Sequence, residues 1–213
     1  MLQQEISEYL EKGKGSVLVG GLVSYYETRE EFRWNFIEKY GFSIIDNDFV
    51  IELVDKLMDN HIQTFTEVYA GNGTLTRVLL ENGFDGVGYT LPVKDDIEGY
   101  GFVEDNPVRK QLLKDKKLIY KDISALDKID SDLLVMSWVP LDGGSEIVEL
   151  SSKGELPEYV LLIGYVNDVV TGSFDFHDWL DETYETIHEF GSFKSFIGVQ
   201  DTARLMKRRK NVS

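Results

Sequence analysis

The 213-residue sequence contains no cysteine. This absence excludes disulfides, cysteine-ligated zinc and thiol nucleophiles together, and it fits a reducing compartment, so we expect a cytoplasmic protein. The chain also lacks any run of about 18 apolar residues and any opening signal peptide, so no membrane span is expected. The apolar stretch from Ser16 to Tyr26 is too short to cross a bilayer and is interpreted as a buried segment.

Positive charge is scarce. The sequence has 22 Lys and Arg residues against 38 Asp and Glu residues, which gives a formal net charge of −16. A surface this acidic repels phosphate backbones, so duplex nucleic acid is disfavoured as a partner and a small molecule or a protein is favoured. The basic run Lys207–Lys210 is interpreted as a charged strand end or tail.

The order of apolar segments predicts an α/β fold. Strands are expected at 65–70, 86–91, 117–123, 131–138, 158–166 and 202–209, and helices at 29–40, 46–60, 74–82 and 175–190. Short apolar strands that alternate with helices indicate a mostly parallel sheet with helices on both faces. We expect one globular unit at 46–213, preceded by a helical extension or lid at 1–45.

The segment "YAGNG", Tyr69–Gly73, joins a predicted strand to a predicted helix. Asn-Gly between apolar runs also signals a hairpin, but Leu75, Val78 and Leu79 follow at helical spacing. The segment is therefore predicted as strand, glycine loop and helix. Such a loop lies at the carboxyl edge of a parallel sheet, where glycines let a ligand approach the backbone and the helix N-terminus suits a carboxylate. The Gly-Lys-Ser/Thr ending of a phosphate-binding P-loop is absent.

The stretch "EVYAGNGTLTRVLLENG" resembles motif I of the class I, Rossmann-like S-adenosylmethionine-dependent methyltransferases, in the form acid-x-x-x-Gly-x-Gly. The acid is Glu67 and the glycines are Gly71 and Gly73. The resemblance extends from about Asp46 to Ile163. It implies a seven-stranded, mostly parallel sheet of order 3-2-1-4-5-7-6, S-adenosylmethionine as cofactor, and methyl transfer to an acceptor that the sequence does not identify.

The same resemblance implies which residues hold the cofactor. At the end of the second strand the family has a ribose-binding acid, where this chain has Thr90, so Asp95 or Asp96 is a candidate substitute. At the end of the third strand Asp122 matches the acid that faces the adenine amino group, although it could equally cap the following turn. The cofactor residues expected are Glu67, Tyr69, Ala70, Gly71, Asn72, Gly73, Tyr89, Thr90, Asp122 and Ile123.

The fourth strand ends in Ser137-Trp138-Val139-Pro140. This segment resembles the Asn/Asp/Ser-Pro-Pro-aromatic motif IV of amino-methylating enzymes, and also the "SWPP" motif of a little-characterised group of methyltransferase-like proteins. In that group an "IGE" strand follows, where this chain has Tyr165 in place of the acid. The resemblance implies that Ser137, Trp138 and Pro140 lie at the reaction centre, with Trp138 as a wall beside the reactive methyl. The alternative is a core tryptophan.

Little acid–base chemistry is visible, which suits a transfer that depends on alignment and exclusion of water. An aromatic pocket also favours a cationic sulfonium. Tyr25, Tyr26 and Trp34 are candidates for a lid, or for ordinary packing. His177 and Asp181 share a helix face, but acids early in a helix are favoured by its dipole, and no metal is expected. The rival function is a non-catalytic or regulatory protein on the same fold.

Overall fold

The computed structural model describes residues 1–16, 22–91, 106–154, 156–165, 171–196 and 200–210. Seven strands form one sheet in the order β3-β2-β1-β4-β5-β7-β6, which confirms the expected α/β fold and strand order. Strands β1 to β5 pair in parallel, and β7 lies antiparallel between β5 and β6. The strands are β1 (Thr64–Val68), β2 (Asp85–Thr90), β3 (Leu118–Tyr120), β4 (Leu133–Ser137), β5 (Tyr159–Tyr165), β6 (Tyr184–Glu189) and β7 (Asp201–Arg208).

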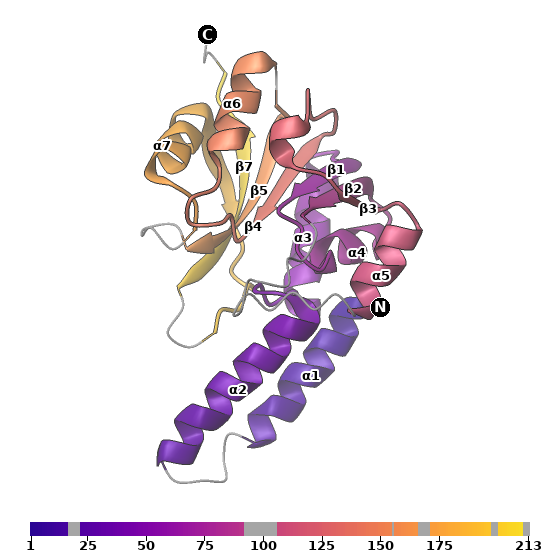
Figure 1. Cartoon of the computed structure of the whole chain (residues 1–213), viewed down its shortest axis with the longest axis vertical. Coiled ribbons are helices and arrows are strands. Elements are labelled where there is room, and N and C mark those ends of the chain that lie inside the picture. Colours follow the sequence, from indigo (N-terminus) through magenta and orange to yellow (C-terminus); the bar gives the residue numbers. More distant parts are fainter. Residues whose placement is uncertain (17–21, 92–105, 155, 166–170, 197–199, 211–213) are drawn as a thin grey trace.

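Helices cover both faces of this sheet (Figure 1). They are α1 (Leu2–Ser16), α2 (Leu22–Tyr40), α3 (Asn47–Asp59), α4 (Thr74–Glu81), α5 (Pro107–Lys114), α6 (Ser145–Lys153) and α7 (Phe174–Thr183), with a short 3₁₀ turn η1 (Ile123–Ala125). Along β4, Leu133 and Val135 join a core with α3 and α4, whereas Leu134 and Met136 join a second core with α6 and α7. Burial on both faces explains why β4 is continuously apolar rather than alternating.

The predicted helix ends are confirmed where a cap residue marks them. Asp46 precedes α3 and accepts a hydrogen bond from the Phe49 N–H at 3.1 Å. Gly41 and Gly83 follow the ends of α2 and α4 with φ of 96° and 92°, a left-handed conformation that glycine adopts without strain.

The predicted helix at 175–190 is wrong in its second half. Helix α7 ends at Thr183, and β6 begins at Tyr184. From there the chain pairs antiparallel with β7, with Glu185 opposite Lys207, and the Tyr184 hydroxyl donates to Pro157 O at 2.9 Å. These partners on distant segments, together with the β-branched pair Thr186–Ile187, outweigh local helical spacing. Helices α5 and α6 were not foreseen, and α1 was foreseen only as part of the helical extension at 1–45.

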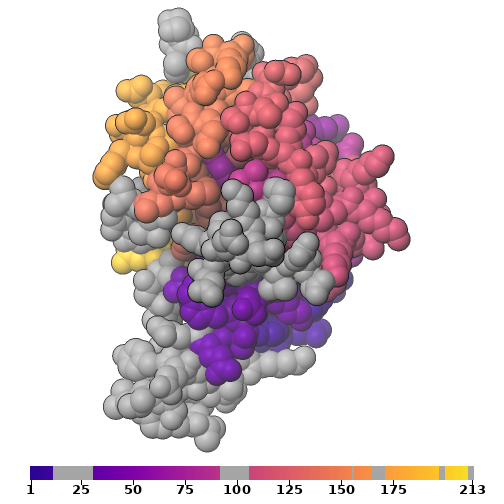
Figure 2. Space-filling model, in the orientation of Figure 1, coloured from indigo at the N-terminus to yellow at the C-terminus, as the bar shows by residue number. Residues whose placement is uncertain are grey.

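Helices α1 and α2 form an antiparallel pair that extends from one end of the sheet (Figure 1). In Figure 2, the purple atoms of the second half of α2 lie below α5 on the side of the molecule that faces the viewer. The last turn of α2 meets the carboxyl edge of the sheet, because the side-chain amides of Asn72 and Asn106 donate to Glu38 O at 3.2 Å and to Lys39 O at 2.8 Å. The division into an extension at 1–45 and a domain at 46–213 stays a prediction.

The segment from Ser16 to Tyr26 contains the end of α1 and the start of α2. Residues 17–21 lie outside the described residues, as do the side chains of the rest of this segment, so its predicted burial stays a prediction. None of the helices in the described ranges has the length and apolar character that a bilayer crossing needs.

Candidate functional site

The expected site residues converge on the carboxyl edge of the sheet around β1. In the sheet, β1 is flanked by β2 on one side and by β4 on the other. This change of direction is the switch point at which open α/β sheets bind ligands. Four non-glycine residues of the described chain have positive φ, and two of them flank this point: Tyr69 (57°) directly after β1 and Trp138 (53°) directly after β4. Strained backbone of this kind persists where surrounding structure enforces it, and it gathers at functional sites.

The glycine loop is built on a buried acid. Glu67, in β1, is 2% exposed, and its carboxylate accepts hydrogen bonds from the hydroxyl and the N–H of Thr76 in the first turn of α4. Burial raises the pKa of Glu67 to about 7. Gly71 and Gly73 are left-handed (53° and 77°), and a Cβ on Gly73 would lie 2.6 Å from Leu112 Cδ1. Gly73 therefore serves packing as well as loop conformation.

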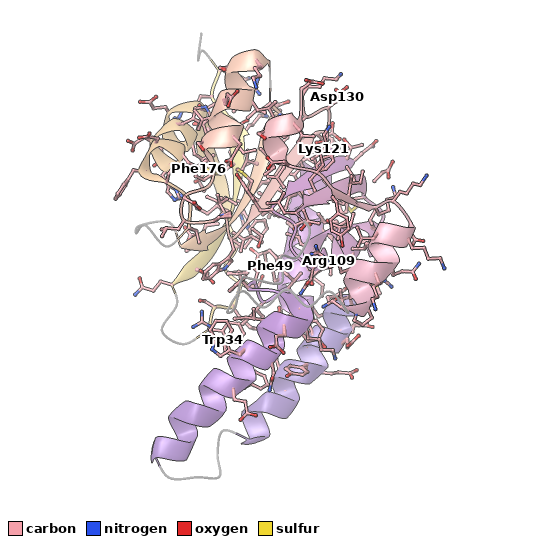
Figure 3. All side chains as sticks on the ribbon, in the orientation of Figure 1. Trp34, Phe49, Arg109, Lys121, Asp130 and Phe176 are labelled. Carbon is pink, nitrogen blue, oxygen red and sulfur yellow. The ribbon has the colours of Figure 1, made fainter. Side chains whose placement is uncertain are left out.

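At the end of β2, the carbonyl oxygens of Gly71 and Leu91 already accept hydrogen bonds from within the chain. Arg109, which is 1% exposed, reaches from α5 toward the strand ends (Figure 3) and donates to Gly71 O and to Leu91 O, the latter at 2.8 Å. The buried Thr90 hydroxyl lies 3.3 Å from Gly71 O and 3.4 Å from Leu91 O. Each carbonyl oxygen has two lone pairs, of which Arg109 uses one, and the single Thr90 O–H can use one more on either oxygen, so these donors leave little acceptor capacity for a ribose hydroxyl.

Sequence reasoning missed Arg109, because a basic residue in a helix three positions after an asparagine has no distinguishing pattern. Its role depends on contacts with Gly71 and Leu91, which are remote in sequence. The suggested substitutes for a ribose-binding acid, Asp95 and Asp96, lie outside the described residues.

Asp122 caps the turn after β3. Its Oδ1 accepts hydrogen bonds from the Ser124 hydroxyl at 2.7 Å and the Ser124 N–H at 2.9 Å, and these bonds lower the pKa of Asp122. Both bonds end on Oδ1, which leaves Oδ2 without a partner in the described chain. Ile123 is buried in the core beside α6. The turn-cap alternative is thus what the structure shows, and contact with adenine stays a prediction.

Tyr69 links the end of β1 to the start of α6. Its hydroxyl donates to Glu146 Oε2 at 3.0 Å and accepts from the Gly144 N–H at 3.0 Å, and burial raises the pKa of Tyr69. Ala70 packs in a small core with Leu112 and Leu118, and the half-buried Tyr89 packs against the core beside α6. The expected loop residues thus fix the relative positions of β1, α5 and α6.

The last residue of β4, Ser137, and the residue that follows it contact the connection between α2 and α3. The Ser137 and Ser43 hydroxyl oxygens are 2.8 Å apart, and the Trp138 ring stacks on Phe42 with centroids 4.9 Å apart. Trp138 is half-buried, which differs from a core tryptophan, and its indole N–H donates to Asp201 Oδ2 at 3.2 Å. Pro140 is exposed, and its carbonyl accepts from the Gly143 N–H at 2.8 Å.

Asp201 is the second functional candidate that sequence reasoning missed. It is the first residue of β7 and pairs with Tyr165, so the antiparallel direction of β7 brings it to the carboxyl edge beside β4. Burial raises the pKa of Asp201 to about 6. The sequence does show an acid directly before the last predicted strand. This acid is placed at the carboxyl edge only if that strand runs antiparallel to its neighbour, and the sequence does not give the direction of the strand.

Other sequence candidates lie apart from this edge. The His177 ring nitrogen bonds to Thr171 O, and the described residues contain no group of three or more metal-ligating side chains. Trp34 is 46% exposed, while the side chains of Tyr25 and Tyr26 lie outside the described part of the chain.

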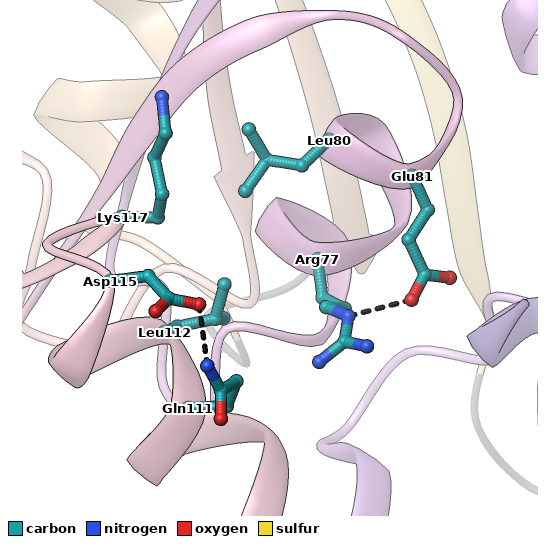
Figure 4. Close-up of a pocket in the computed structure, with 7 residues that line it drawn as sticks. All are labelled: Arg77, Leu80, Glu81, Gln111, Leu112, Asp115 and Lys117. Atoms are coloured by element: carbon teal, nitrogen blue, oxygen red, sulfur yellow. Dashed lines mark hydrogen bonds and ion pairs between the residues drawn. The ribbon is translucent and has the colours of Figure 1, made fainter.

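A groove of about 580 Å³ between α4 and α5 holds none of the expected site residues (Figure 4). An Arg77–Glu81 ion pair and a Gln111–Asp115 hydrogen bond lie in its wall. Its lining residues are Arg77, Leu80, Glu81, Gln111, Leu112, Asp115 and Lys117. This groove is therefore separate from the candidate site.

No known sequence family matches the chain, and no curated protein is similar to it in sequence at a significant level. Solved structures are similar. A S-adenosylmethionine-dependent methyltransferase from Clostridium acetobutylicum is 10% identical, with a TM-score of 0.52 over 85% of this chain and 99% of that one. Human N-acetylserotonin methyltransferase, solved with S-adenosylmethionine, is 13% identical, with a TM-score of 0.51 over 96% of this chain and 66% of that one.

The chain has the class I methyltransferase fold. At the carboxyl edge of the sheet, the described residues have the chemistry to contact S-adenosylmethionine at two places. Asp122 Oδ2 is a possible acceptor for the adenine amino group, and the Trp138 and Phe42 rings suit a sulfonium. At the end of β2, by contrast, the described residues supply no carboxylate, and the nearby carbonyls are bound by Arg109 and Thr90.

Proposed function

We propose that this chain binds S-adenosylmethionine at the carboxyl edge of β1 to β4 and is a methyltransferase. The observation that carries the proposal is the pair of left-handed residues, Tyr69 and Trp138, at the ends of the two strands that flank the switch point. Positive φ in two bulky residues, each followed by a glycine-containing loop and a helix, supports an edge shaped for a ligand rather than for stability.

Each part of this edge has a task in the proposal. The left-handed Gly71 lets the loop approach the amino-acid end of the cofactor, and Glu67 holds the loop to α4. Asp122 accepts from adenine, and Trp138, fixed by Phe42 and Asp201, excludes water beside the methyl group. The cofactor supplies an activated methyl group, so the protein has mainly to align the acceptor with it.

The proposed acceptor is a small molecule or a protein. A formal charge of −16 opposes association with duplex nucleic acid, whose binding depends on phosphate neutralisation by cations.

Mass spectrometry of the purified protein tests the proposal. Denaturation of protein taken directly from cells should release S-adenosylmethionine or its demethylated product at a substantial fraction of the protein concentration. The Gly71→Val variant, purified in the same way, is the matched control and should release neither. Equal nucleoside in both samples, or none in either after addition of millimolar cofactor, would contradict the assignment.

A specific observation favours the rival, a non-catalytic protein on the methyltransferase fold. Thr90 stands where the resemblance implies an acid, and Arg109 fills the neighbouring carbonyl acceptors. A protein that kept the fold and lost cofactor binding would tolerate this change. The rival predicts that the wild type and Gly71→Val behave alike in the extraction.

A further inference from the structure

Asp201 has a carboxylate oxygen that no donor in the described residues satisfies. The residue is 9% exposed, and Oδ2 accepts from the Trp138 indole, but Oδ1 is buried without a hydrogen-bond partner. Buried acceptors in folded proteins are nearly always paired, and leaving one unpaired is unfavourable. The unused oxygen therefore indicates that a donor from outside the chain completes this site.

The position of Asp201 identifies which side of the edge this donor would occupy. Asp201 pairs with Tyr165 at the end of β5, one strand beyond β4, and binds Trp138 directly. The glycine loop, Thr90 and Asp122 belong to the ends of β1, β2 and β3. Asp201 thus lies on the opposite side of Trp138 in the strand order from the residues proposed to hold the cofactor.

The positive charge of Arg33 bears on whether the group that donates to Asp201 is cationic or neutral. The Arg33 charge on α2 lowers the pKa of Asp201, opposing the larger effect of burial, yet no ion pair joins the two side chains in the described residues. The Arg33 Nε is buried without a hydrogen-bond partner in the described residues, and the guanidinium carbon lies 5.7 Å from the centroid of the Phe196 ring. Asp201 attracts a cationic group and Arg33 repels it, so the two charges together give a cation little net advantage, whereas a neutral group with an N–H or O–H bond can still donate to Asp201.

We propose that Asp201, with Trp138 and Arg33, forms the acceptor subsite and recognises a neutral N–H or O–H group carried on an aromatic ring. The inference rests on the proposed function, because it takes this side of Trp138 as the acceptor side. The stacked Trp138 and Phe42 rings provide the flat apolar surface that an aromatic ring needs. Asp201 is then a specificity-determining residue.

Two small amines test the subsite. Aniline has N–H donors, and N,N-dimethylaniline has the same ring without them; both are mainly neutral at pH 7.5. Titrations followed by NMR on the ¹⁵N-labelled protein should show aniline binding about tenfold more tightly, the difference made by a hydrogen bond to a charged acceptor. The indole N–H resonance of Trp138, assigned with Trp138→Phe, should move during the titration.

In Asp201→Asn the one amide oxygen is taken by the Trp138 indole N–H, so the NH2 group stands in the place of Oδ1 and cannot accept. This variant should lose the preference and bind both amines with similar affinity, whereas the exposed control Asp130→Asn should retain it. If Asp201→Asn does not fold, Asp201→Ser carries the same expectation. Equal affinity for both amines in the wild type, no saturable binding of either, a shift that spares Trp138, or a preference kept in Asp201→Asn would each overturn the inference.

A parallel titration with S-adenosylhomocysteine separates this inference from the proposed function. Unchanged affinity for the nucleoside in Asp201→Asn, with the amine preference lost, supports both. A wild type that distinguishes the amines but binds no nucleoside keeps the subsite and refutes the cofactor. A wild type that binds the nucleoside but does not distinguish the amines refutes the subsite alone.

Discussion

Glu67 links the stability of the protein to pH. Its carboxyl is buried beneath the glycine loop, and burial raises its pKa from 4.5 to about 7. The folded state therefore holds the Glu67 proton more tightly than the unfolded state does, and the free energy of unfolding falls as pH rises from about 4.5 to about 7. A shift of this size corresponds to about 3 kcal/mol.

The variant Glu67→Gln should remove this dependence, because an amide oxygen still accepts from Thr76 without becoming charged. The compared quantity is the free energy of unfolding of Glu67→Gln minus that of the wild type. We expect this difference to be up to about 3 kcal/mol larger at pH 8 than at pH 4.5, in favour of the variant. Urea unfolding across this range measures it. The exposed Glu31→Gln is the control, and parallel curves for wild type and Glu67→Gln would show that Glu67 is ionised without penalty.

Prediction from sequence succeeded for elements whose residues are contiguous, as in β1, the glycine loop and α4. Glu67, Gly71 and Gly73 lie within seven positions, so a strand, a loop and a helix could be read together. Arg109 and Asp201 depend on contacts with Gly71 and Trp138, which are 38 and 63 positions away. No local pattern encodes such distances, and the structure was needed to find them.

The last turn of α2 is held to the start of α5 by Asn106. Its Oδ1 caps α5 by accepting from the N–H groups of Val108 and Arg109 at 2.9 and 3.1 Å, while its Nδ2 donates to Lys39 O at 2.8 Å. One side chain thus joins two elements that are far apart in sequence, and the same helix carries Arg109 into the site.

The variant Asn106→Asp should separate these two bonds. Aspartate caps a helix as well as asparagine does, but it cannot donate to Lys39 O. We expect amide hydrogen exchange in the last turn of α2 to accelerate about tenfold or more, because local opening becomes easier, while α5 remains protected. Asn60→Asp, which removes a comparable donor at the end of α3, should leave α2 unchanged. Unchanged exchange in α2 would show that Asn106 does not hold it.

Element types were predicted best where apolar spacing and a cap agree, as in α3 and α4. The segment after Thr183 was mispredicted because its strand conformation comes from pairing with β7, not from its own sequence. Helix α5 was missed although Asn106 and Pro107 form a good helix start, because the short segment that follows has few apolar residues.

The whole molecule combines a methyltransferase fold with an edge that departs from the pattern implied by the resemblance at the end of β2. The strand order, and with it the switch point, agrees with the resemblance found in motif I. Thr90 stands where the resemblance implies a ribose-binding acid, and Arg109 donates to the neighbouring carbonyl oxygens of Gly71 and Leu91. The central claim is therefore a binding claim.

Isothermal titration calorimetry with S-adenosylmethionine and S-adenosylhomocysteine tests that claim most directly. The account predicts saturable one-to-one binding to the wild type and none to folded Gly71→Val, because a β-branched side chain at φ of 53° is strained and would extend into the ligand's place. No heat and no thermal shift for the wild type at millimolar concentration of either ligand would contradict it.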